Sequence, residues 1–224
     1  MTVPSDKTWP RLLSLAVHEL RTPATVVAGY LRMLMKDRVG PLSDDQRRLV
    51  EEAEKSCGRI SALLAEMSDL AHFELGDAPF AQQTVDVAAV LREVVENAAT
   101  GPDLATVTAT DINGPAEVAG DAARLRAALS AILRCVQREL PTSSIAVQLQ
   151  SESGSTIIAI GAPESVKALT RAESPDPAFD DLRGGMGMAL PLARRVIERH
   201  GGRLAVLPEN PRAGAAVVLP LKRA

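Results

Sequence analysis

Hydrophobic residues recur every three or four positions along the first third of the chain, from about Trp9 to about Phe73. This period predicts amphipathic helices. The polar segment DRVGPLSDDQ, which contains Gly40 and Pro41, predicts a break between two helices, with Ser43 as the N-cap of the second. The two apolar stripes are Leu13, Ala16, Leu20, Val27, Leu31 and Leu34, followed by Leu49, Ala53, Cys57, Ile60, Leu64, Met67 and Leu70. Residues 1–75 are therefore expected to form a helical hairpin.

A two-helix hairpin cannot bury both of its apolar faces by itself. The simplest solution is to pair with a second copy as a four-helix bundle, which predicts a homodimer through this region. The alternative is that the hairpin packs against the second half of its own chain.

The pattern changes between Gly76 and Gln83. Beyond this boundary, helical patterns alternate with β-like runs, and QSESGST predicts a hairpin turn between two of the runs. The helical patterns are Val87 to Ala98, Ala122 to Glu139 and Met188 to His200, and the β-like runs are ATVTATDI, SIAVQLQS, STIIAIGA, GRLAVLPE and GAAVVLPL. This order predicts an α/β sandwich over residues 84–224, with helices on one face of a mostly antiparallel sheet. The whole chain is thus of the α+β class.

Composition narrows the possible partners and compartment. Of the 224 residues 46% are hydrophobic but only 2% are aromatic, so the core must be aliphatic. A formal net charge of -3 without a basic block argues against nucleic acid as a partner. No apolar run approaches the roughly 20 residues that span a bilayer, and the N-terminus lacks a signal-peptide core. Cys57 and Cys135 lie in apolar helical patterns and suggest neither a disulfide nor a zinc site. We therefore expect a cytoplasmic protein without a metal centre.

The most informative segment is HELRTP, from His18 to Pro23, preceded by SLAV. It resembles the phosphoacceptor box of two-component sensor histidine kinases. The helix–turn–helix layout resembles that family's dimerisation and histidine-phosphotransfer domain. The C-terminal GGMGMALPLARRVIERHGGRL and the later LPL resemble the end of its ATP-binding domain. The resemblance covers nearly the whole chain and implies a sandwich of the histidine-kinase ATPase type and a response-regulator receiver domain as partner.

The residue types of this box suit phosphoryl chemistry. Imidazole has an unperturbed pKa near 6.5, so at neutral pH one nitrogen of His18 has a free lone pair that can attack phosphorus. The carboxylate of Glu19 can hold the proton on the other nitrogen. Thr22 lies one helical turn later, where its hydroxyl can orient a water, and the resemblance links this position to phosphatase activity. Pro23 is expected to bend the helix and expose the face that carries the histidine.

The sequence gives less support to other functional roles for the three histidines. A zinc protease is excluded because Thr22 stands where the second histidine ligand of such a helix would be needed. His72 is expected to be a surface residue at a helix end. His200 precedes Gly201 and Gly202 and is expected to be part of a structural helix cap.

Several nucleotide contacts of the resembled family are missing. The two asparagines that hold magnesium and phosphate in that family fall at Ala131 and Cys135, and neither side chain suits a hard cation. Gly161 stands at the position of the aspartate that binds adenine, and Pro163 and Ser165 stand where glycines are expected. An adenine amino group left without its partner would cost about 1–3 kcal/mol.

The last glycine box of the resembled family is partly retained. Gly184, Gly185 and Gly187 precede a predicted helix, which is a geometry that can cradle phosphate. However, Ala189 replaces a glycine, and Met186 and Met188 make the loop bulkier and more apolar. We expect a vestigial loop rather than an intact nucleotide site.

The sequence thus favours a histidine-kinase-like phosphorelay protein that exchanges a phosphoryl group between His18 and a receiver aspartate and has impaired ATP binding. One alternative is an active autokinase with an atypical nucleotide site, for which ATP and magnesium would be the cofactors. A second alternative is a non-catalytic adaptor that binds receivers or a kinase.

Overall fold

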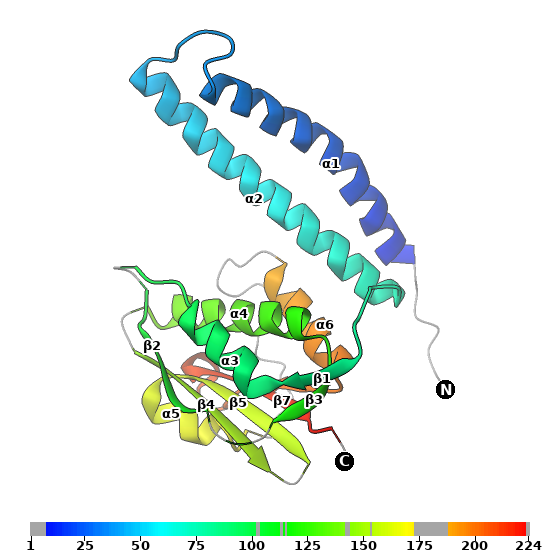
Figure 1. Cartoon of the computed structure of the whole chain (residues 1–224), viewed down its shortest axis with the longest axis vertical. Coiled ribbons are helices and arrows are strands. Elements are labelled where there is room, and N and C mark those ends of the chain that lie inside the picture. The colour runs from blue at the N-terminus through cyan, green and yellow to red at the C-terminus, as the bar shows by residue number, and fades with distance from the viewer. Residues whose placement is uncertain are drawn as a thin grey trace. The chain divides into compact units, whose positions relative to one another are not determined.

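The computed structural model describes residues 8–101, 104–112, 114, 116–141, 144–152, 154–172 and 188–222. The chain divides into two compact units, Met1–Ala78 and Pro79–Ala224. The first unit consists of α1 (Thr8–Met35) and α2 (Asp44–Leu75), which pack along each other as the predicted hairpin (Figure 1).

The ends of the hairpin helices follow from local sequence. Ser43 is the N-cap of α2: its hydroxyl accepts a hydrogen bond from the amide of Gln46, whose side chain accepts one from the amide of Ser43. This capping box confirms the predicted start of the helix. Gly76 ends α2 in the left-handed region, with φ of 80°. Pro23 does not end α1, which continues as one helix through it.

The second unit is built on a five-stranded sheet of order β2-β4-β5-β7-β6, in which only β2 and β4 pair in parallel. A smaller antiparallel pair, β1 and β3, lies outside this sheet and was not predicted from the sequence. The strands are β1 (Gln83–Asp86), β2 (Val107–Ile112), β3 (Glu117–Gly120), β4 (Ile145–Glu152), β5 (Ser155–Gly161), β6 (Arg203–Ala205) and β7 (Gly214–Pro220). All five predicted β-like runs are therefore confirmed.

The predicted helices are α3 (Val87–Glu96), α4 (Ala122–Glu139) and α6 (Ala189–Arg199), and they lie on one side of the sheet (Figure 1). The short helix α5 (Pro163–Leu169) lies on the opposite side, so the expectation that helices cover one face only is wrong for this element. A short 3-10 helix, η2 (Pro211–Ala213), precedes β7. Within the described part of the chain, no helix is long and apolar enough to cross a bilayer.

The two faces of the sheet differ in side-chain size, and this difference explains α5. One face carries large aliphatic side chains that are at most 2% exposed, including Val147, Leu149, Ile158, Ile160 and Val217. The other face carries small residues, Ala146, Ala159 and Ala216, which pack with Val166 and Leu169 of α5. Small strand residues allow a helix to approach closely, so seven residues suffice to cover this half of the face.

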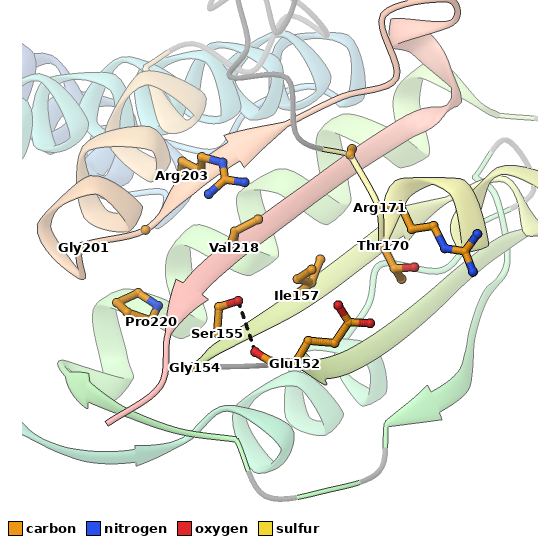
Figure 2. A pocket seen from close by; sticks show the side chains of 12 residues that line it. Glu152, Gly154, Ser155, Ile157, Thr170, Arg171, Gly201, Arg203, Val218 and Pro220 are labelled. Atoms are coloured by element: carbon orange, nitrogen blue, oxygen red, sulfur yellow. Dashed lines mark hydrogen bonds between the residues drawn. The ribbon is translucent and has the colours of Figure 1, made fainter. Parts of the chain in front are cut away.

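Among the described residues, no helix covers the other half of that face. A depression of about 730 Å³ lies there. Figure 2 shows Ile157 and Val218 among the side chains that line it. The exposed side chains of Glu152, Arg171 and Arg203 stand at its rim. An antiparallel sheet can face water on one side, and charged rim residues are typical of such a solvated face.

Candidate functional site

His18 lies on the exposed surface of α1. Its side chain is 79% exposed and that of Glu19 is 72% exposed, and the distance from His18 Nδ1 to Glu19 Oε1 is 3.4 Å. The preceding residue, Val17, is buried. No other described residue hydrogen-bonds to the imidazole. A carboxylate beside Nδ1 favours the proton on that nitrogen and leaves the lone pair on Nε2 facing solvent.

Thr22 is exposed one turn beyond His18, so α1 brings the three predicted site residues onto one exposed stretch of helix. Pro23 has no amide hydrogen, and therefore cannot donate to the carbonyl of Glu19. The hydroxyl of Thr25 donates to the carbonyl of Arg21 at 2.8 Å. The helix α1 continues through the proline.

An apolar groove of about 470 Å³ runs between α1 and α2 next to this site. Leu20, Val27 and Ile60 line it, and each is about half exposed. Cys57 lies at its floor, where its thiol donates to the carbonyl of Ala24 at 3.5 Å. Large apolar side chains that share one exposed groove mark an interaction surface.

The two positions that correspond to the magnesium-binding asparagines of the resembled family are buried. Ala131 and Cys135 are both buried in α4 and offer no oxygen ligand. In the described part of the chain, no group of three histidine, cysteine or carboxylate side chains could hold a metal ion.

Gly161 stands where the resembled family has its adenine-binding aspartate, and the space beside it is filled largely by backbone atoms. A Cβ atom on Gly161 would lie 2.4 Å from the carbonyl oxygen of Ala213 and 2.8 Å from Cδ1 of Leu169. An aspartate therefore does not fit where β5 ends. Only Ala162 separates β5 from α5, so Pro163 and Ser165 are helical residues and leave no room for a glycine loop. The described residues at these positions therefore offer adenine neither the aspartate nor the glycine loop of the resembled family.

The third nucleotide element cannot be compared in this way. Gly184, Gly185 and Gly187 lie outside the described residues, as does Met186. The described chain resumes at Met188, followed by Ala189 as the first residue of α6.

The remaining two histidines have structural partners. His72 is partly exposed at the end of α2, with its Nδ1 2.9 Å from Oδ1 of Asp77. His200 is buried: its Nδ1 lies 2.7 Å from the carbonyl of Val196, and its Nε2 accepts a hydrogen bond from the amide of Asp121 at 3.1 Å. His200 thus links the end of α6 to the start of α4. The sequence pattern did not reveal this contact, because its partner is 79 residues away.

Comparisons with known sequences place these features in context. A model of the His Kinase A (phospho-acceptor) domain matches residues 10–76. The chain is 28% identical over 203 residues to the circadian input-output histidine kinase CikA of Synechococcus elongatus, covering 84% of this chain and 27% of CikA. It is 28% identical over 198 residues to the phosphate regulon sensor protein PhoR of Pseudomonas aeruginosa, covering 84% of this chain and 44% of PhoR. The chain thus spans less than half the length of either relative.

Solved structures show the same fold. Full-length ShkA in complex with AMPPNP has a TM-score of 0.67 at 20% identity, over 96% of this chain and 46% of ShkA. The histidine kinase AdeS of Acinetobacter baumannii has a TM-score of 0.57 at 18% identity, over 92% of this chain and 98% of that one. The fold class expected from the sequence is confirmed.

Proposed function

Because the chain belongs to the two-component sensor histidine kinase family, we propose that it carries a phosphoryl group on His18 and exchanges it with an aspartate of a response-regulator receiver domain. The observation that carries this proposal is the imidazole of His18, 79% exposed with Glu19 beside Nδ1 and no partner on Nε2 among the described residues. The chain is then a phosphotransferase of the histidine kinase family.

The transfer step follows from this geometry. The lone pair on Nε2 of His18 attacks the phosphorus of the receiver's aspartyl phosphate. An N–P bond forms, the acyl O–P bond breaks, and the aspartate leaves as a carboxylate. The positive charge that develops on the imidazole is stabilised by Glu19, which lies beside the protonated Nδ1. We assign to Thr22, which is exposed one turn beyond His18, the role of orienting a water in the hydrolytic variant of the reaction.

Two surfaces of the hairpin support the proposed partners. The groove lined by Leu20, Val27 and Ile60 is the surface through which we expect two copies to form a four-helix bundle. Val26 and Tyr30 are exposed on α1 but do not line the groove, so they remain accessible for a receiver domain beside His18.

We further propose that ATP is not the phosphoryl donor. This is supported by the burial of Ala131 and Cys135 and by the backbone that fills the space next to Gly161. The retained Gly184, Gly185 and Gly187 favour the alternative of an autokinase with unusual nucleotide contacts. If the chain accepts phosphate neither from a receiver domain nor from ATP, the non-catalytic adaptor is the remaining alternative.

Labelling from two donors tests the proposed function. The full chain is incubated either with a receiver domain carrying radiolabelled aspartyl phosphate or with labelled ATP and magnesium. We expect label on this chain from the receiver and none from ATP. Rapid labelling from ATP would establish the autokinase alternative, and no labelling from any of several receivers would favour the adaptor.

The groove offers a separate prediction about the dimer. Val27→Asp should raise the dimer dissociation constant at least about a hundredfold, because each interface would bury two unpaired carboxylates. Val26→Asp is the matched control, since Val26 is the adjacent valine with nearly the same exposure, 49% against 51%, but does not line the groove. Sedimentation velocity over a range of concentrations measures both variants. Equal dissociation constants for the two variants would contradict dimerisation through the groove.

A further inference from the structure

We propose that the depression on the sheet face beside α5 binds a small phosphate monoester with a compact apolar body. This depression is called the outer pocket here, and the side chains that carry the proposal are Glu152, Ile157, Arg171, Arg203 and Val218. It lies on the face that α5 partly covers, whereas α4, with Ala131 and Cys135, covers the opposite face (Figure 1). The proposed site is therefore separate from the nucleotide positions of the resembled family, and it does not depend on the phosphoryl chemistry proposed for α1.

The register of the strands places the floor of the outer pocket. Val218 of β7 is paired with Ile157 of β5 on one side and with Arg203 of β6 on the other. Residues that lie directly opposite each other in neighbouring strands share a face of the sheet. Two positions before Val218, Ala216 packs against α5, which ends at Leu169. The row formed by Ile157, Val218 and Arg203 is therefore on the α5 face, just past the residues that α5 covers.

The size of the outer pocket favours a small molecule. Around the floor, its lining residues come from three separate turns: the residues after α5, including Thr170, the turn at Gly154 between β4 and β5, and the turn at Gly201 before β6. Its volume is about 730 Å³, and sites that hold small molecules have about 300–1,000 Å³. An extended protein segment would have to pass over these turns, whereas a small molecule fits between them.

Two arginines give the rim of the outer pocket its positive charge. Arg203 stands on the β6 side and Arg171 stands just after α5, with the apolar floor between them (Figure 2). Both are exposed, and within the described part of the chain neither forms an ion pair. Glu152, the only carboxylate among the lining residues, accepts a hydrogen bond from the side-chain amide of Gln150. Both guanidinium groups are therefore available to an anion.

An organic phosphate matches both parts of the outer pocket. A phosphate monoester carries about -1.5 to -2 charges at pH 7 and presents three acceptor oxygens, which guanidinium groups bind bidentately. Ile157 is partly exposed in the floor, so an apolar body placed on it would remove apolar surface from water. Inorganic phosphate could use the arginines of the rim but not the floor. The apolar body should therefore add to the affinity.

Methyl NMR of the full chain tests the outer pocket, with naphthyl phosphate and inorganic phosphate as the probes. We expect naphthyl phosphate to shift the methyl signals of Ile157 and Val218 until they saturate. Inorganic phosphate should bind at least about tenfold more weakly, because it leaves the floor exposed to water. The methyl signals of Val27 and Ile60, which line the hairpin groove, are the internal control and should not move.

Three arginine variants test the rim. Arg203→Gln and Arg171→Gln should each raise the dissociation constant for naphthyl phosphate at least about tenfold, since each removes a charge-assisted contact. Arg212→Gln is the matched control and should leave it unchanged, because Arg212 is an exposed arginine of the same unit that does not line the outer pocket. The proposal would be overturned by equal dissociation constants for the three variants, by equal binding of the two probes, or by shifts confined to the hairpin groove.

Discussion

Replacing His18 by glutamine should abolish transfer of phosphate to this chain while leaving the fold intact. The carboxamide of glutamine has similar size and polarity, but its nitrogen has no available lone pair for attack on phosphorus. The His18 side chain is 79% exposed and, among the described residues, has a polar interaction only with Glu19, so its loss should change the free energy of unfolding by less than about 0.5 kcal/mol. Labelling from a phosphorylated receiver and thermal unfolding measure the two effects separately.

Glu19→Gln distinguishes the nucleophile from the residue that positions it. This variant keeps the lone pair of His18 but loses the carboxylate 3.4 Å from Nδ1, so transfer should slow about a hundredfold without stopping. Label that persists in His18→Gln would place the acceptor on another residue and refute the proposed role of His18.

Gly161→Asp should destabilise the second unit by more than about 4 kcal/mol rather than create an adenine site. The added Cβ alone would lie 2.4 Å from the carbonyl of Ala213, and backbone cannot move aside as a flexible side chain can. The carboxylate would be forced against that oxygen and the side chain of Leu169 without a donor. Urea unfolding and titration with a fluorescent ATP analogue measure stability and binding in the same samples.

Two further glycine substitutions serve as controls. Gly161→Ala should be destabilised by roughly 1–3 kcal/mol, because the clash begins at Cβ. Gly58→Ala should be stabilised by about 0.5–1 kcal/mol, since Gly58 lies in the interior of α2 with no atom within 4 Å of its added Cβ. A Gly161→Asp protein that folds normally and binds the nucleotide would show that the adenine position is open.

The long elements could be predicted because their patterns are long. The hairpin repeats its apolar stripe over two helices of 28 and 32 residues, and β4, β5 and β7 are largely aliphatic runs of seven or eight residues. By contrast, β1 and β3 have four residues each and α5 has seven, which is too short for a period to emerge. These short elements depend on tertiary contacts that the local sequence does not encode.

In the candidate site, too, the features formed by neighbouring residues could be predicted, and those formed by residues far apart in the sequence could not. His18, Glu19 and Thr22 lie within five consecutive positions of one helix, so their spacing alone brings them together. The missing aspartate at Gly161 was visible in the sequence, but the closure of the space around it was not. That closure depends on Ala213, which is 52 positions away and approaches only because β5 and β7 are paired.

The division at Ala78 has a consequence for how such a chain can diverge. His18, the proposed phosphoacceptor, and the groove both belong to the N-terminal unit, whereas every position at which the sequence departs from the resembled nucleotide site belongs to the C-terminal unit. Drift in one half therefore leaves the reactive imidazole of the other untouched. Natural selection can therefore act on the two units separately, and substitutions at the nucleotide positions need not alter the surroundings of His18.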